Sequence, residues 1–281
     1  MGRPVVLSDN LFNPRIYPDH VLDASSTATN THALYLSSGR RIRDLTGWQA
    51  SALNTIGWVE STFDQLRAFD LLWIDRDHNL AGESVYVVLS DDDFATIQTI
   101  GPKTVPTDPV PMSRLYDGEI VMTDEGALLW YLELQATYAV RVYVAAMGAG
   151  LRPEMAGLAV GKLWTPESAA IKPNVLPRTN LTYTAERSTL GQDASSEFGC
   201  YRSQELRLRM ASWEEYATAL YPVESLFLKR RPTVVIPDDE QAERAVLTRV
   251  APGAVGFEVP QNQFLPEITI PWEESQPELV N

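Results

Sequence analysis

The chain lacks the residues on which several common kinds of functional site depend. Its 281 residues include a single cysteine, Cys200, and three histidines far apart in sequence, His20, His32 and His78. One cysteine excludes an internal disulfide, so folding requires no oxidising compartment, and we expect Cys200 to be a buried free thiol. Neither an H-E-x-x-H zinc motif nor a G-x-S-x-G nucleophile elbow occurs. These absences favour a protein that is not an enzyme and has no cofactor.

A long apolar run is also missing. No segment approaches the roughly 20 apolar residues of a membrane span. The N-terminal sequence MGRPVVLSDNLFNPRIYPDH contains no apolar core of signal-peptide length. We therefore expect a protein that is made in a cytosol and does not insert into a membrane.

Positive charge is scarce. The 23 Lys and Arg residues face 37 Asp and Glu residues, which gives a formal net charge of -14. Nonspecific nucleic-acid binding requires a positive patch, and the basic clusters at 40–43 and 229–231 are short. Each cluster predicts a solvated loop or an ion-paired edge strand. The chain is thus not expected to bind nucleic acid, whereas 44% hydrophobic residues suffice for a core.

Strand patterns dominate residues 15–147. Leu66–Ile74 is apolar on both faces, which is typical of a strand buried in a sandwich core. Val85–Leu89 alternates between two faces, with Tyr86 and Val85 on opposite ones. Leu128–Leu134 and Tyr138–Val144 also alternate and predict a hairpin with its turn at 136–137. The fold class is mainly β, with a jelly-roll β-sandwich over residues 1–150.

The second half predicts a smaller domain of mixed character. The glycines at 148 and 150 mark a boundary, and residues 151–180 are apolar and then proline-containing, as in a connecting segment. Residues 181–281 predict a strand-rich α+β domain with an extended acidic tail. Its one short helix begins at the capping box Ser212–Glu215 and ends at Pro222. The predicted strands are Glu205–Met210, Thr233–Ile236, Ala245–Val250 and Gly256–Val259.

Two acidic loops follow predicted strands and suggest calcium. Residues 75–79 read D-x-D-x-N, the first half of a calcium loop in which alternating oxygens converge on a hard cation. Leu80 replaces the required glycine and Tyr86 the bidentate glutamate, so a solvated turn is the main prediction. Residues 91–93 are adjacent carboxylates, which repel one another unless they are solvated or metal-bound. Calcium is the alternative, favoured if the two loops are neighbours. The candidate ligands are Asp75, Asp77, Asn79, Asp91 and Asp93.

Three tryptophans lie close together in sequence. Aromatic rings bind sugars by stacking on their apolar faces, but tryptophan in a sandwich is more often part of the core. Trp73 is expected in the core. Trp48 and Trp58 each follow a glycine and are the candidates for stacking on a glycan.

The first half resembles a known family. The segments ASSTATNTHALYLSSGRR, TGWQAS, GWVESTFDQLRAFDLLWIDRDHNL and VYVVLSDDDF resemble the discoidin-like, galactose-binding-like jelly roll over about residues 20 to 147. The disulfide that often joins the ends of secreted members is absent. The resemblance implies a binding or assembly module.

The second half resembles a different group. LAVGKLWTPESAAIKPNV resembles the G-R-L-W segment of tail and baseplate proteins of long-tailed bacteriophages, with Lys162 where Arg is usual. In those proteins it follows such a jelly roll and precedes a strand-rich part, here RSQELRLRMASWEEYATAL. This resemblance implies a virion structural protein of the tail tip or baseplate, assembled in the host cytoplasm. Its partners would be other tail proteins, copies of itself and a host surface glycan.

Two hypotheses therefore stand. The first is an oligomeric structural subunit of a phage tail. The second is a non-catalytic, lectin-like carbohydrate-binding module, and a glycan-processing enzyme is a third and minor alternative.

Overall fold

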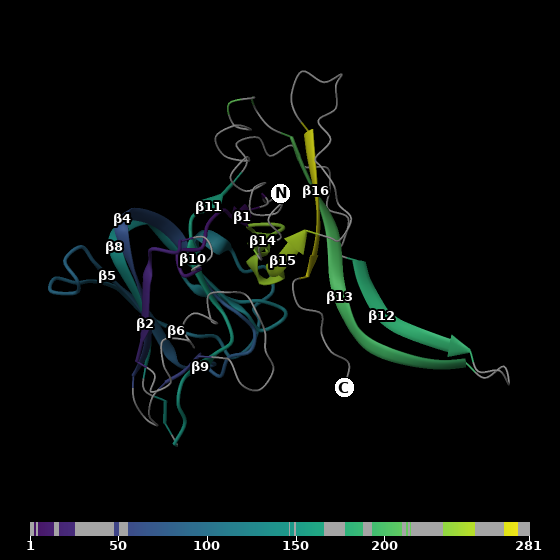
Figure 1. Cartoon of the computed structure of the whole chain (residues 1–281), viewed down its shortest axis with the longest axis horizontal. Helices are drawn as coiled ribbons and strands as arrows, with labels where there is room; N and C mark the ends of the chain where they lie inside the picture. The colour runs from purple at the N-terminus through teal and green to yellow at the C-terminus, as the bar shows by residue number, and fades with distance from the viewer. Residues whose placement is uncertain are drawn as a thin grey trace. The chain divides into compact units, whose positions relative to one another are not determined.

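The computed structural model describes residues 3, 5–13, 17–25, 48–50, 56–145, 147–148, 150–165, 178–187, 193–209, 212, 214, 233–250 and 267–274. The chain divides into two compact units. Unit 1 contains Met1–Trp164 and Ile236–Ala245, and unit 2 contains Thr165–Val235 and Val246–Asn281. The described residues are mainly β, as predicted (Figure 1).

Two long strands organise unit 1. Strands β4 (Gly57–Ile74) and β8 (Leu128–Val144) pair antiparallel along almost their whole length. Their register shifts twice, between Thr62 and Arg67 and between Phe69 and Leu71. Such bulges bend a strand and increase its twist, so each strand passes from one layer of a sandwich to the other.

Different strands flank the two halves. The first layer holds the start of β4 and the end of β8, with β2 (Val21–Ala24) beside β4, β5 (Ser84–Ser90) beside β8, and β6 (Gln98–Thr104) beyond β5. The second layer holds the other two halves, with β10 (Leu158–Gly161) beside β4 and β7 (Ile120–Met122) beside β8. This is a jelly-roll-like sandwich.

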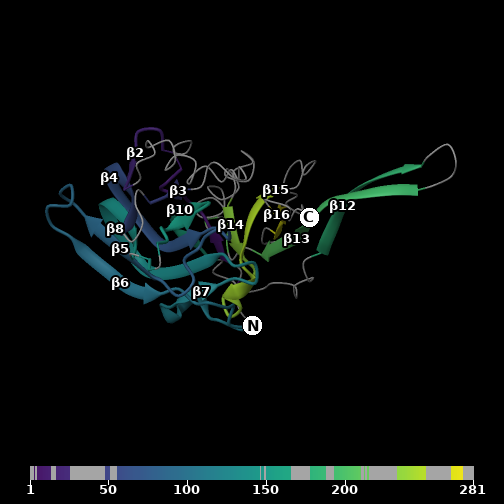
Figure 2. The same cartoon turned by 90° about the horizontal axis from the view of Figure 1, so that it is seen from below.

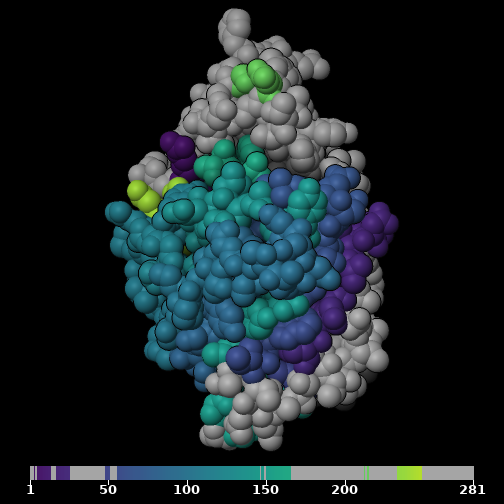
Figure 3. Space-filling view, turned by 90° about the vertical axis from the view of Figure 1, so that its left-hand side faces the viewer, coloured from purple at the N-terminus to yellow at the C-terminus, as the bar shows by residue number. Residues whose placement is uncertain are grey.

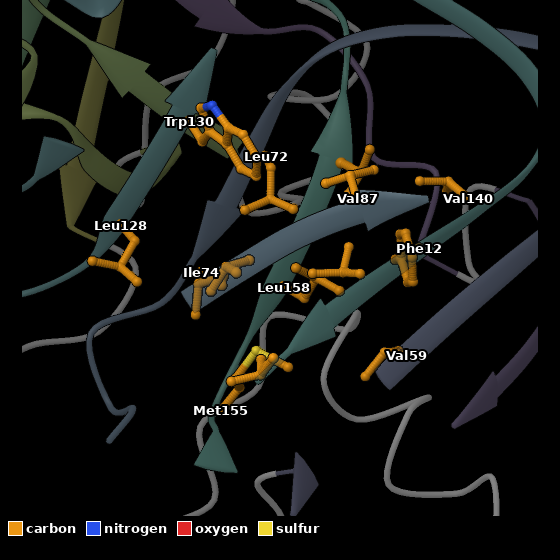
Figure 4. Packing of buried hydrophobic residues seen from close by; sticks show 14 of the residues in the cluster. Phe12, Val59, Leu72, Ile74, Val87, Leu128, Trp130, Val140, Met155 and Leu158 are labelled. Atoms are coloured by element: carbon orange, nitrogen blue, oxygen red, sulfur yellow. The ribbon is translucent and has the colours of Figure 1, made fainter. Parts of the chain in front are cut away.

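One hydrophobic core fills the space between the layers. Val59, Val87 and Val140 come from the first layer and Leu72 and Trp130 from the second, and all belong to one buried cluster (Figure 4). In the first layer, every second residue of a strand points into the core: Val85, Val87 and Leu89 of β5 belong to the buried cluster, and Tyr86 and Val88 lie on the other face.

The second layer is buried on both faces. Leu71 and Trp73 alternate with the core residues Leu72 and Ile74 but are also buried. The prediction of a doubly buried strand is therefore confirmed for Leu71–Ile74. It is wrong for Leu66, which lies at the bend with its side chain 55% exposed.

The predicted hairpin at 136–137 is wrong. Residues 128–144 form the single strand β8, and Ala136 and Thr137 remain paired with Ala68 and Arg67 of β4. The break in the apolar alternation marks the bend between layers rather than a turn. The polar residue at the bend, Thr137, donates its hydroxyl to the carbonyl of Ser90 at 2.8 Å.

The N-terminal segment lies along unit 1. Strand β1 (Val5–Leu7) pairs with β11 (Leu163–Trp164), and β2 pairs with β4. In the space-filling view the purple N-terminal residues lie along the flank of the jelly roll (Figure 3). Short elements complete the unit: β3 (Trp48–Gln49), β9 (Glu154–Met155), and the 3₁₀ turns η1 (Leu115–Asp117) and η3 (Ala242–Arg244).

The compact unit extends past the predicted boundary at residue 150. The part of the predicted connecting segment that is described forms strands β9, β10 and β11, and β10 belongs to the second layer. The distant segment Ile236–Ala245 also belongs to unit 1. Its residue Glu243, 5% exposed, accepts the backbone N–H groups of Met112 and Ser113 with its two carboxylate oxygens.

Unit 2 contains an antiparallel sheet. Its strands are neighbours in the order β14 (Thr233–Ile236), β15 (Val246–Val250), β16 (Glu267–Glu274), β13 (Asp193–Arg209) and β12 (Arg178–Arg187). The predicted strands at 205–209, 233–236 and 246–250 are confirmed. The predicted helix after Ser212 and the strand Gly256–Val259 lie outside the described residues, apart from Ser212 and a helical Glu214.

Among the described residues, no helix has the length and apolarity to cross a bilayer.

Candidate functional site

The face of the first layer that points away from the core carries a row of aromatic side chains. Trp58 of β4 is the cross-strand neighbour of Tyr143 on β8, and Tyr143 is the neighbour of Tyr86 on β5. Directly paired residues share a face of a sheet. All three are partly exposed. The rings of Tyr86 and Tyr143 stack in parallel, with centroids 4.7 Å apart and an interplanar angle of 3°.

Arg141 occupies the next row of the same face. Its Nε donates to Glu60 Oε2 at 2.6 Å, and Nη2 forms an ion pair with the same oxygen. Its Nη1 donates to the hydroxyl of Tyr143 at 2.8 Å. The guanidinium carbon lies 4.4 Å from the centroid of the Trp58 ring and 3.8 Å from that of Phe94, both cation–π distances. We call Trp58, Tyr86, Phe94, Arg141 and Tyr143 the aromatic cluster.

A hydrogen-bonded loop holds Phe94 over Arg141. The hydroxyl of Ser90 accepts the N–H groups of Asp92 and Phe94, and Asp92 Oδ1 accepts the N–H of Thr96 at 2.7 Å. Asp93 and Phe94 both have left-handed backbones, with φ of 55° and 63°. For residues other than glycine such a conformation costs on the order of 1–2 kcal/mol each. The loop is therefore fixed by its polar side chains in a conformation that its backbone alone would not favour.

The charges of the cluster are set by burial and by their partners. Desolvation raises the pKa of Glu60, and the hydrogen bond and charge of Arg141 oppose that rise. The nearby carboxylates of Asp23 and Asp93 raise the pKa of Glu60 further. Desolvation also raises the pKa of Tyr86, with a contribution from Tyr143, so the Tyr86 phenol stays protonated near neutral pH.

This arrangement combines the groups that sugar recognition requires. Ring faces and edges of Trp58, Tyr86 and Tyr143 offer apolar surface, and the tyrosine hydroxyls are hydrogen-bond donors and acceptors. Arg141 and Glu60 add charged groups whose positions are fixed by each other. No described group in the cluster is poised as a nucleophile activated by a base, so the arrangement fits binding rather than covalent chemistry.

Of the two predicted stacking residues, the structure places only Trp58 in this cluster. Trp48 is 0% exposed and belongs to the core, so it presents no ring face to a ligand. The glycine before Trp58 explains the difference, because a Cβ on Gly57 would lie 2.4 Å from the ring of Trp48. Gly57 therefore makes room for a core tryptophan. Trp73 is buried, as expected.

The five calcium candidates do not come together. Asn79 is hydrogen-bonded to the backbone of Arg152 and Glu154 at one end of the sandwich. Asp91 accepts the hydroxyl and N–H groups of Thr137 and Tyr138 at the bend. Strand β5 separates the two loops by about 20 Å at roughly 3.3 Å per residue. Across the part of the chain that is described, no three His, Cys, Asp or Glu side chains gather as metal ligands.

Sequence reasoning missed four members of the cluster. The alternation in residues 85–89 already placed Tyr86 on the face opposite the core residues, and the same holds for Arg141 and Tyr143 in β8. Phe94 carried no such signal, since its position depends on the loop after β5.

A second group of polar side chains lies under the N-terminal segment. Tyr17 donates its hydroxyl to Asp9 Oδ2 at 2.5 Å and stacks on His20, with centroids 4.3 Å apart. The guanidinium of Arg67 lies 4.6 Å from the Tyr17 centroid on the side of β4. His20 Nδ1 lies 3.2 Å from the carbonyl of Leu11, while the buried Nε2 has no partner in the described structure. Burial lowers the pKa of His20 and raises that of Asp9.

No protein-family model matches the sequence, and no curated protein matches it. Among solved structures, the chain is similar to a GH29 fucosidase of Ruminococcus gnavus, with 16% identity over 58% of this chain and 28% of that one, at a TM-score of 0.38. It is similar to a CBM32 module of Clostridium perfringens, with 12% identity over 54% of this chain and 98% of that one, at 0.37. It is also similar to a fucose-binding module of Streptococcus pneumoniae, with 14% identity over 54% of this chain and 94% of that one, at a TM-score of 0.37.

The similar region thus spans only about a quarter to a third of the fucosidase but nearly all of each separate module. At these identities and TM-scores the likenesses assign neither a family nor a ligand to this chain. The phage-tail resemblance receives no support from them and stays a prediction.

Proposed function

We propose that unit 1 is a non-catalytic carbohydrate-binding module and that the aromatic cluster is its binding surface. The observation that carries the proposal is the row of Trp58, Tyr143 and Tyr86 on three adjacent strands, facing away from the core. Strands lie about 4.8 Å apart, so the three rings span about 10 Å, the length of two sugar rings.

The rigidity of the cluster supports binding. Arg141 is held by Glu60, Tyr143 and two aromatic rings, so it loses little conformational freedom when a ligand arrives. Strained backbone conformations such as those of Asp93 and Phe94 concentrate at functional sites. Neutral sugars suit this surface better than anionic ones, because the exposed Asp91–Asp93 lies beside it.

Binding of neutral sugars tests the proposal. Titration calorimetry of the full chain against galactose, glucose, mannose, fucose and their oligomers should detect at least one ligand, with equal affinity in EDTA and in calcium. Truncation of a well-packed aromatic contact costs more than about 1 kcal/mol, so Trp58→Ala and Tyr86→Ala should each weaken binding about tenfold.

Tyr138→Ala is the matched control. Tyr138 is an exposed tyrosine on the same strand as Tyr143, at the bend and outside the cluster, so its loss should leave affinity unchanged. The proposal would be contradicted if both Trp58→Ala and Tyr86→Ala bound the sugar with unchanged affinity. It would also be contradicted if the wild type bound none of these sugars.

A second candidate is the virion assembly subunit that the sequence predicts. The loop that follows β6 favours it, because this loop presents the apolar side chains of Val110 and Met112, which are 59% and 70% exposed. Met112 has a left-handed backbone (φ 60°) that is held by Glu243. Rigidly presented apolar side chains are typical of protein contacts. Immunogold labelling of purified particles tests this candidate, and absence of the chain from such particles would exclude it.

A further inference from the structure

Strands β12 and β13 form a ribbon that extends beyond the sheet of unit 2. Strand β12 pairs with residues 193–203 of β13, from Arg178 opposite Ser203 to Arg187 opposite Asp193. Strand β16 pairs with β13 only over Ser203–Arg209. In the described structure, residues 193–202 therefore have a neighbour on one side only, and β12 is the end strand of its sheet (Figures 1 and 2).

A ribbon of only two strands has little stability of its own. A two-stranded hairpin is marginally stable in water, and stability generally requires three or more strands. As far as the chain is described, each outer edge presents a row of backbone N–H and C=O groups that no strand pairs with, and such an edge can pair with another strand. The ribbon therefore favours the addition of further strands.

The two outer edges differ in their protection. Proteins guard exposed edges with charged residues, proline, bulges or short strands. Residues 179–185 of β12 read TNLTYTA, with no charge and no proline, and four of the seven are Thr or Tyr, which favour strands. Strand β12 carries its three charges, Arg178, Glu186 and Arg187, at its two ends, whereas residues 193–202 of β13 also carry Glu197 and Gly199 in the middle. The register shift between the two strands leaves Phe198 of β13 as an extra residue, so the bulge also lies in β13. Strand β12 is therefore the less protected edge over residues 179–185.

The charge of the ribbon also allows two copies to approach. Residues 178–203 contain three arginines and three acids, so their formal charge is zero in a chain whose net charge is -14. The arginines are Arg178, Arg187 and Arg202, and the acids are Glu186, Asp193 and Glu197. Two acidic chains repel each other least where their contact is made by this neutral arm.

We propose that β12 is a dimerisation edge that pairs antiparallel with β12 of a second copy of this chain. Antiparallel pairing of two identical strands has two-fold symmetry. Both copies therefore use the same strand in the interface, and no second surface of the chain is needed. The result is a four-stranded sheet built from two ribbons. The proposal is independent of sugar binding by unit 1.

Analytical ultracentrifugation of the full chain tests this inference. The wild type should dimerise reversibly at micromolar concentrations. Thr184→Lys places a like charge from each copy at the shared edge and should weaken the dimer at least tenfold. Ser196→Lys is the matched control, because Ser196 is the cross-strand partner of Thr184 on β13. It adds the same charge at the paired position of the ribbon, but on β13 rather than on the β12 edge.

A charge exchange separates dimerisation from a general loss of folding. Thr184→Glu alone should also weaken the dimer at least tenfold, whereas an equimolar mixture of Thr184→Lys and Thr184→Glu chains should restore it. A wild type that stays monomeric at 100 µM (about a hundredfold above the expected range) would overturn the inference, as would equal effects of the lysines at 184 and 196. The inference would also be overturned if the mixture of Thr184→Lys and Thr184→Glu chains did not form the dimer.

Discussion

The pair of Arg141 and Glu60 provides a sharp test of how the cluster is stabilised. Arg141→Met removes the guanidinium and leaves the Glu60 carboxylate buried without its partner. The two side chains are 20% and 11% exposed, closer to a buried pair than to a surface pair. Breaking a buried pair from one side costs about 3–5 kcal/mol, and a surface pair is worth less than about 1 kcal/mol. We expect Arg141→Met to lower the free energy of unfolding by about 3 kcal/mol at pH 7.5.

The same geometry predicts how Arg141→Met and Glu60→Gln act when they are combined. Glu60→Gln alone keeps an oxygen that accepts from Arg141 and should cost only about 1 kcal/mol. In the double variant no charge is left stranded, so it should be more stable than Arg141→Met alone, with a coupling of about 2 kcal/mol. Urea unfolding followed by tryptophan fluorescence measures all four chains, and Trp58 lies beside the replaced side chain.

Lowering the pH provides an independent check. Burial raises the pKa of Glu60, and loss of Arg141 raises it further. A carboxyl group whose folded pKa is raised above its unfolded value takes up a proton on folding, so the penalty shrinks as the pH falls. The destabilisation by Arg141→Met should therefore be smaller at pH 5 than at pH 7.5. Additive effects of the two substitutions, or a penalty that does not change with pH, would refute this reasoning.

Three other predictions concern the packing of unit 1. Burial raises the pKa of Asp70 to about 6, so Asp70→Asn should stabilise the protein by about 1 kcal/mol at pH 8 and by progressively less towards pH 4, as measured by thermal unfolding. Gly161→Ala would place a Cβ 2.0 Å from the carbonyl oxygen of Asp9, so it should cost at least about 2 kcal/mol in urea unfolding. Burial lowers the pKa of His20, so the wild type should lose stability below about pH 6.5 relative to His20→Gln, a difference that thermal unfolding at pH 7.5 and 5 detects.

Local patterns in the sequence predict much of the fold. Alternation in residues 85–89 predicts a strand that the structure confirms, because one face of this strand meets the core. The break at residues 136–137 is misread as a turn, since a polar pair between two apolar runs looks the same in a hairpin and in a bent strand. Only the partner strand decides, and β4 stays paired with β8 through the bend. Pairing between residues about 70 positions apart, such as Ala68 with Ala136 and Arg67 with Thr137, leaves no local signature.

The candidate site is predictable to a smaller extent. Trp58 is found because tryptophan is conspicuous, but Trp48 has the same sequence context and lies in the core. The two residues lie in different sheets: Trp58 is in β4, whereas Trp48 is in the short strand β3, which pairs with β9. The position of Phe94 depends on Ser90 and Asp92, whose side chains hold the loop. A hydrogen-bonded loop with left-handed residues cannot be read from apolar periodicity.

The contrast between the two layers supports the proposed position of the binding surface on unit 1. In the second layer, Leu71 and Trp73 are buried although they alternate with core residues, so both of its faces are occupied by protein. In the first layer the face opposite the core carries Trp58, Tyr86 and Tyr143 in partly exposed positions. A sandwich that needed this face only for solubility would place short polar or charged side chains there. Three large rings and an arginine held by its partners expose apolar area at a cost in solvation, which supports the proposal that a ligand covers them.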